Sequence, residues 1–122
     1  MMDKTTFINA FKRRTKTFAG SIVLFYDKLP KDSSTQVMGK QLIRSATSTA
    51  ANYRAACIAR SDREFYAKLS ITVEEADETL FWLELFEETK KASLQELQPL
   101  MDEALEILKV LGSARRNSKN KN

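Results

Sequence analysis

The stretch Ser61–Phe86, SDREFYAKLSITVEEADETLFWLELF, decides the fold because it has the pattern of one long helix with two apolar sides. Mostly apolar residues recur at steps of three and four, and this spacing places them along one stripe of a helix with 3.6 residues per turn. That stripe comprises Phe65, Leu69, Thr72, Val73, Ala76, Leu80 and Leu83. We therefore expect a helix at about residues 61–90 that packs into a core and begins with a capping box of Ser61 and Glu64.

A second group of residues lies on the opposite side of this helix, at about 100° per residue. A monomeric bundle has nothing on that side to cover an indole, so we predict that this side contacts a second copy of the chain. The predicted oligomer interface consists of Ile71, Glu75, Glu78, Trp82 and Leu85.

Two helices are expected before this stretch. The first lies at about residues 5–29 and is ended by Pro30, and the second lies at about residues 34–59 after a capping box of Ser33 and Gln36. Their core stripes are Phe7, Phe11, Phe18, Ile22, Phe25 and Leu29 in the first helix, and Leu42, Ala46, Thr49, Tyr53 and Ala56 in the second. The many Ala, Ser and Thr residues of the second helix predict that other helices approach it closely.

A fourth helix is expected at about residues 94–111, with an end at Gly112. Its stripe is Leu97, Leu100, Met101, Ala104, Leu108 and Leu111. Pro99 leaves two starts open, either a kinked first turn after Ser93 or a regular helix from near Gln98. The bundle domain then spans residues 1–112, and residues 113–122 form a basic tail that should be disordered in isolation.

These four segments predict an all-α fold, an antiparallel up-down-up-down four-helix bundle, because each segment has one apolar stripe and the connections are short. The chain of 122 residues is the length of one domain. Only three Gly and two Pro are present, fewer than the turns of a sheet protein need. The single cysteine, Cys57, cannot form an internal disulfide, and no apolar run reaches the length of a signal peptide or a membrane span. We expect a soluble cytoplasmic protein with no membrane contact.

The absence of histidine limits the chemistry. Di-iron bundles, hydrolase triads and zinc sites all need histidine or several cysteines. The carboxylates Glu74, Glu75, Asp77 and Glu78 fit a solvated or ion-paired helix surface better than a magnesium site, and Glu75 and Glu78 could pair with Arg44 or Arg54 of a neighbouring subunit. We predict no enzymatic activity, no catalytic residue, no metal and no cofactor.

Charge is divided unevenly along the chain. Residues 1–60 contain 11 Lys or Arg and 3 Asp, whereas residues 61–122 contain 9 Lys or Arg and 13 Asp or Glu. The basic half could pack on acidic helices, within a subunit or between subunits, or attract phosphates. The candidate nucleic-acid contacts are Lys12, Arg13, Lys16, Lys40, Arg44, Arg54, Arg115 and Arg116.

The run RSATSTAANYRAACIARSDREFYAKLSITVEEADETLFWLELFEE, which starts at Arg44, resembles the four-helix bundle proteins related to those encoded in 23S rRNA intervening sequences. The matching features are Arg44-Ser45, Ser48, Asn52, the helix start at Ser61 with Glu64-Phe65, Leu69, and the segment EADETLFWLEL. The resemblance implies a bacterial protein whose bundles assemble as a ring, typically a homopentamer.

This family also includes the accessory variability proteins of diversity-generating retroelements, which bind nucleic acid through basic surfaces and contact a reverse transcriptase. Those branches tend to have an Asn followed by an Ala-Glu-Gly segment, where this chain has Asn52-Tyr53-Arg54-Ala55-Ala56. This departure points to the less characterised side of the family. Two functions therefore fit the sequence: a ring-forming accessory protein that binds RNA or DNA, and a protein-only oligomeric scaffold or adaptor.

Overall fold

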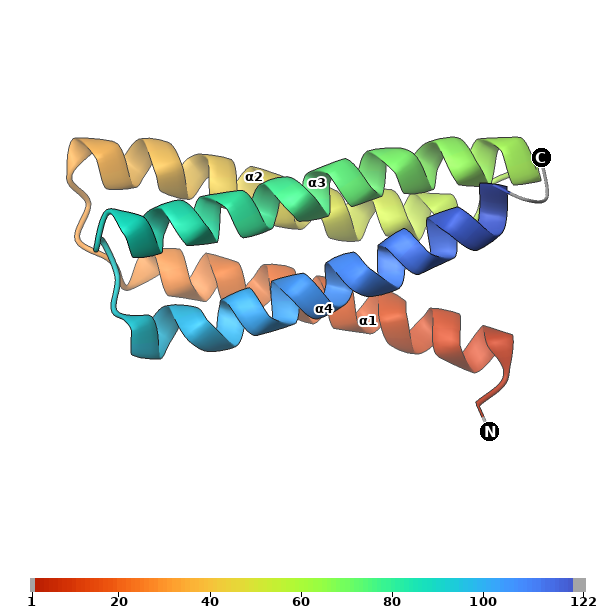
Figure 1. Cartoon of the computed structure of the whole chain (residues 1–122), viewed down its shortest axis with the longest axis horizontal. Coiled ribbons are helices and arrows are strands. Elements are labelled where there is room, and N and C mark those ends of the chain that lie inside the picture. Colours follow the sequence, from red (N-terminus) through yellow and green to blue (C-terminus); the bar gives the residue numbers. More distant parts are fainter. Residues whose placement is uncertain (1, 120–122) are drawn as a thin grey trace.

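The computed structural model describes residues 2–119, which form four helices. These are α1 (Lys4–Asp27), α2 (Ser33–Ala56), α3 (Asp62–Glu88) and α4 (Leu94–Lys119). Each helix packs against two others, in the order α1, α2, α3, α4 and back to α1. In Figure 1 all four lie along the long axis of the molecule, and the connections between them lie alternately at its two ends. The prediction of an all-α bundle is confirmed.

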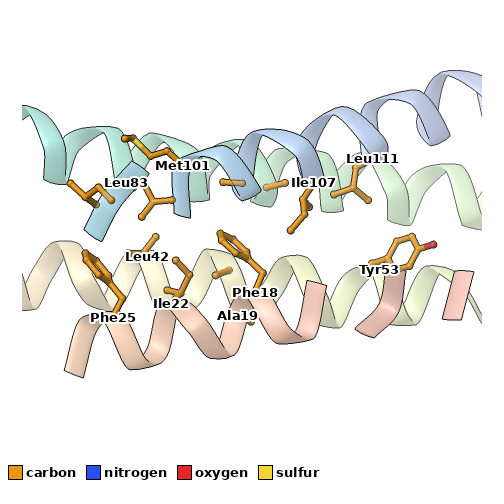
Figure 2. Packing of buried hydrophobic residues seen from close by; sticks show 14 of the residues in the cluster. Phe18, Ala19, Ile22, Phe25, Leu42, Tyr53, Leu83, Met101, Ile107 and Leu111 are labelled. Atoms are coloured by element: carbon orange, nitrogen blue, oxygen red, sulfur yellow. The ribbon is translucent and has the colours of Figure 1, made fainter. Parts of the chain in front are cut away.

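The core lies along the middle of the bundle and receives side chains from every helix. Figure 2 shows this for Ile22 of α1, Leu42 of α2, Leu83 of α3 and Leu111 of α4, which are fully buried. All five residues of the predicted α2 stripe are buried. In the predicted α1 stripe, Phe7 is not buried. It lies near the start of the helix, and 46% of it is exposed. Burial of each large apolar side chain contributes roughly 1.5–3 kcal/mol.

The helix starts differ from the predicted caps in two places. Asp32 caps α2 in place of Ser33, because its carboxylate accepts a hydrogen bond of 2.9 Å from the backbone N–H of Thr35. Ser61 caps α3 as predicted, and its hydroxyl accepts a hydrogen bond of 3.0 Å from the N–H of Glu64. The Glu64 carboxylate reaches the N–H of Arg60, one residue before the position that a capping box requires.

The last helix starts and ends outside the predicted limits. It begins at Leu94 and includes Pro99, so a start near Gln98 is wrong. It also continues through Gly112 to Lys119. The expected helix end at Gly112 is therefore wrong. The expected tail without structure is wrong for residues 113–119, which are helical. Residues 120–122 of that tail lie outside the described residues.

Candidate nucleic-acid and subunit interfaces

The first candidate interface is the surface of α1 and α2, which we call the basic face. No Asp or Glu occurs from Lys4 to Tyr26 or from Ser33 to Arg60. In contrast, α3 carries nine acidic residues and two basic ones. The bundle therefore has one side that is strongly basic and one helix that is strongly acidic, and the basic side creates a potential that attracts phosphate groups.

Contacts in the core fix how α1 and α2 lie along each other. The ring of Phe11 packs edge-on against that of Tyr53, with centroids 4.9 Å apart. Nearer the other end, the ring of Tyr26 lies against Gly39. These two contacts place Lys12 and Lys16 of α1 alongside the part of α2 that contains Arg54. Residues far apart in the sequence thus share one surface.

Most cations of the basic face are available to a ligand. Arg13, Lys16, Lys40 and Arg54 are exposed, and none lies within 4.0 Å of a carboxylate in the described part of the chain. Lys12 is half-buried and lies near Cys57. Burial raises the pKa of the Cys57 thiol, and the positive charge of Lys12 opposes this rise.

Arg44 differs from the other predicted contacts because its guanidinium is engaged within its own chain. Its Nη1 donates a hydrogen bond of 2.8 Å to Oε2 of Glu75, its Nη2 donates to Oε2 of Glu78, and its Nε donates to Oε1 of Gln41 at 3.1 Å. The hydrogen bonds to Glu78 and Glu75 raise the pKa of Arg44. Both Glu75 and Glu78, which the sequence allowed to pair with a neighbouring subunit, are bonded to Arg44 of the same chain.

The second candidate interface, the outer surface of α3, surrounds this cluster. The indole of Trp82 is half-buried, and its Nε1 donates a hydrogen bond of 3.0 Å to Oε2 of Glu78. Leu85 is also half-buried, whereas 49% of Ile71 is exposed. Phe81, which the sequence analysis missed, is 51% exposed, and its ring packs edge-on against Trp82 with centroids 5.0 Å apart. The sequence does contain a signal for Phe81. It lies four residues after Asp77 and three before Glu84, so an apolar side chain shares a helix face with two acidic ones.

The two arginines predicted near the chain end have different surroundings. Arg115 is half-buried, its Nε donates a hydrogen bond of 2.8 Å to Oγ of Ser70, and its guanidinium lies over the ring of Tyr66 at 4.9 Å. It therefore ties α4 to α3. Arg116 is exposed and remains available to a ligand.

The ion pair between α1 and α4 had no sequence signal. Arg14 of α1 binds Glu103 of α4 through two hydrogen bonds of 2.7 Å each, which raise the pKa of Arg14. This pair joins α1 and α4, so Arg14 does not add to the cations of the basic face. Among residues 2–119, no group of three or more His, Cys, Asp or Glu side chains is placed to hold a metal ion. The helices of this same region include none with the length and hydropathy of a membrane span.

The fold resembles that of a solved protein. A crystal structure of a protein of unknown function from the S23 ribosomal protein family of Bacteroides thetaiotaomicron VPI-5482 matches with a TM-score of 0.82. The two sequences are 37% identical, and the match covers 89% of this chain and 97% of the other. A search of curated proteins found no match.

The sequence itself matches the 23S rRNA-intervening sequence protein family over residues 9–113. The matched range covers most of α1, all of α2 and α3, and α4 as far as one residue beyond Gly112. It includes the Arg44–Glu75–Glu78 cluster and most of the basic face. The chain therefore belongs to the 23S rRNA-intervening sequence protein family.

Proposed function

We propose that this protein is a non-enzymatic accessory protein that binds the phosphate backbone of nucleic acid through its basic face and assembles with copies of itself into a ring. The observation that carries the proposal is the lack of acidic residues from Lys4 to Tyr26 and from Ser33 to Ala56, together with exposed cations that have no carboxylate partner among residues 2–119. The contacts we assign are Lys12, Arg13, Lys16, Lys40, Arg54 and Arg116.

The chemistry of these contacts predicts their kind of recognition. Lys and Arg side chains on an exposed helix surface bind phosphates and release counterions, which gives affinity with little dependence on base sequence. Arg44 and Arg115 are not assigned to this role, because their guanidinium groups already bond to Glu75, Glu78 and Ser70. The two helices of the basic face thus supply most of the affinity.

The ring is proposed from the family and from the outer surface of α3. A homopentamer is the assembly that the family resemblance favours. Ile71 and Phe81 expose about half of their apolar surface there, next to the half-buried Trp82 and Leu85. An apolar centre with a polar rim is typical of a subunit interface. In the proposed ring, antiparallel up-down-up-down bundles present this surface of α3 to a neighbouring copy.

A double variant tests the nucleic-acid contacts. Lys16→Gln with Arg54→Gln removes two exposed cations of the basic face without touching the core. We expect weaker binding to every RNA or DNA sequence, with a slope of log affinity against log salt that is reduced by about 2. Filter binding to a labelled oligonucleotide measures both quantities.

The matched control is Lys109→Gln, which removes an exposed lysine from α4. Its binding should equal that of the wild type. Equal affinities for all three proteins would contradict the assignment of the basic face.

The second candidate function is a protein-only scaffold, and the exposed apolar surface of α3 is the observation that favours it. A reverse transcriptase is one partner to test, because the retroelement branch of the family contacts one, but the departure at Asn52-Tyr53-Arg54-Ala55-Ala56 points away from that branch. Light scattering after size exclusion, combined with the filter assay, separates the two functions. An oligomer that binds a protein partner and no nucleic acid would replace the first proposal with the second, and a monomer would contradict the ring in both.

A further inference from the structure

A cleft of about 770 Å³ opens at one end of the bundle. In Figure 1 the start of α1, the connection from α2 to α3 and the end of α4 all lie at this end of the bundle. All four helices contribute to the walls, through Phe7, Tyr53, Cys57, Phe65, Asn117 and Ser118 among others. Its volume lies within the range of small-molecule sites. We call it the end cleft.

The end cleft contains an exposed aromatic ring that is held in place. The ring of Phe7 lies parallel to that of Phe11, with an interplanar angle of 3° and centroids 6.1 Å apart. Phe11 in turn packs edge-on against Tyr53, so the stack is anchored in the core. Nearly half of Phe7 remains exposed. A fixed, exposed ring of this kind is a platform on which a nucleobase can stack.

Polar groups on α4 line the same cleft. Ser118 is only 5% exposed, and its buried Oγ has no hydrogen-bond partner among residues 2–119. A buried hydroxyl without a partner is rare in folded proteins, since its burial is unfavourable until it forms a hydrogen bond. The neighbouring side-chain amide of Asn117 offers both a donor and an acceptor. A ligand with polar edges would satisfy these groups.

Cations surround the cleft and connect it to the basic face. Lys4 lines it, and Lys12 lies beside Cys57 in its wall. Arg60 also lines the cleft, but its guanidinium is paired with Glu64 at 3.6 Å. A chain of phosphates that follows α1 and α2 would therefore arrive at the cleft. Asp62 also lines the cleft, at the start of α3.

We propose that the end cleft receives an unpaired base of single-stranded nucleic acid. The base stacks on Phe7, its polar edge bonds to Asn117 and Ser118, and Lys4 contacts a flanking phosphate. This inference rests on the proposed function and specifies its ligand. A base inside a duplex cannot enter a cleft, so the protein should prefer single strands to duplexes of the same length.

The test uses a single-stranded RNA that contains 2-aminopurine, whose fluorescence falls when it stacks. Wild-type protein should quench this probe, and Phe7→Leu should abolish the quenching and weaken single-strand binding by roughly tenfold, the effect of losing one stacked base. Binding of Phe7→Leu to duplex RNA should be unchanged. The control is Leu105→Ala, which alters an exposed apolar residue of α4 outside both the cleft and the α3 surface and should behave as the wild type.

A second variant covers the polar side of the cleft. Ser118→Ala removes the hydroxyl that has no partner, and it should weaken single-strand binding without loss of helix content by circular dichroism. Equal wild-type affinities for single strands and duplexes would overturn the inference, as would full quenching by Phe7→Leu. The proposed function is tested separately by the Lys16→Gln, Arg54→Gln protein. If that protein binds single strands and duplexes more weakly than the wild type, the basic face still binds nucleic acid even when the end cleft does not receive a base.

Discussion

At the scale of single residues, the packing of α1 against α2 depends on one glycine. A Cβ at Gly39 would overlap the ring of Tyr26, which packs directly on the glycine backbone. Gly39→Ala should therefore force the two helices apart and lower the free energy of unfolding by about 1–3 kcal/mol. Urea denaturation followed by circular dichroism measures the change.

The control for this variant is a glycine in open space. Nothing lies within 4 Å of a Cβ built on Gly20 of α1. Gly20→Ala should stabilise the protein by about 0.5–1 kcal/mol, because alanine loses less conformational entropy in a helix. If both variants shift the urea midpoint in the same direction, the packing of Tyr26 on Gly39 does not limit the approach of these helices.

A second prediction at this scale concerns the pH response of Glu78. The indole N–H of Trp82 and then the guanidinium of Arg44 lower the pKa of its carboxyl group below the usual 4.5. The folded state therefore gains stability from ionised Glu78 above about pH 4.5, and this contribution is lost as the pH falls through the lower, folded-state pKa. Trp82→Phe should raise the pKa of Glu78 by removing the hydrogen bond.

An NMR titration of the Glu78 side-chain carbonyl carbon checks this shift. Asp32 serves as the internal reference, because its pKa is lowered by hydrogen bonds from Thr35 and Lys91 in a different part of the molecule. Its titration should be the same in both proteins. An unchanged Glu78 titration in Trp82→Phe would show that the indole does not stabilise the carboxylate.

Individual contacts were the least predictable part of this chain. Periodicity placed Glu75 and Glu78 beside each other and away from the core, but it could not show that Arg44 of α2 reaches both. The cap at α2 was predicted one residue late because Ser33 and Asp32 are both good caps, and only the backbone position of Thr35 decides between them. Phe7 fits the core stripe in spacing, yet it lies where α1 and α4 leave a cleft.

At the scale of elements, the extended end of α4 depends on tertiary contacts. Gly112 followed by a polar, basic segment is a typical helix end. In the structure, Ala114 packs on the core and Arg115 bonds to Ser70 of α3. Tertiary packing therefore outweighs the local signal for a helix end. The other helix boundaries, by contrast, were predictable to within three residues, since Pro30 and Ser61 mark them clearly.

Two neighbouring arginines test this account of α4. Arg115→Ala removes a hydrogen bond to Ser70 and a cation–π contact with Tyr66, so it should lower the free energy of unfolding by about 1–2 kcal/mol. Arg116→Ala removes an exposed side chain and should change it by less than about 0.5 kcal/mol. Thermal melts of both variants give the comparison. Equal melting temperatures would mean that the last turns of α4 do not depend on Arg115.

At the scale of the whole molecule, the fold class was predictable because each segment repeats its apolar residues with a helical period. Burial confirms the stripes of α2 and the centre of α3, from Leu69 to Leu83. The unequal distribution of charge was also visible in the sequence. What the sequence could not show is that Arg14 and Arg44 are removed from the cations of the basic face by their ion pairs with Glu103, Glu75 and Glu78.

Binding of phosphates by the basic face can be measured through the salt dependence of binding by the wild-type protein. The affinity for a single-stranded RNA is measured by filter binding between about 50 and 200 mM salt. Contacts between four phosphates and exposed cations such as Lys16 and Arg54 predict a slope of log affinity against log salt near −3, about −0.7 for each phosphate. A slope near zero, or no binding at the lowest salt concentration, would contradict the account.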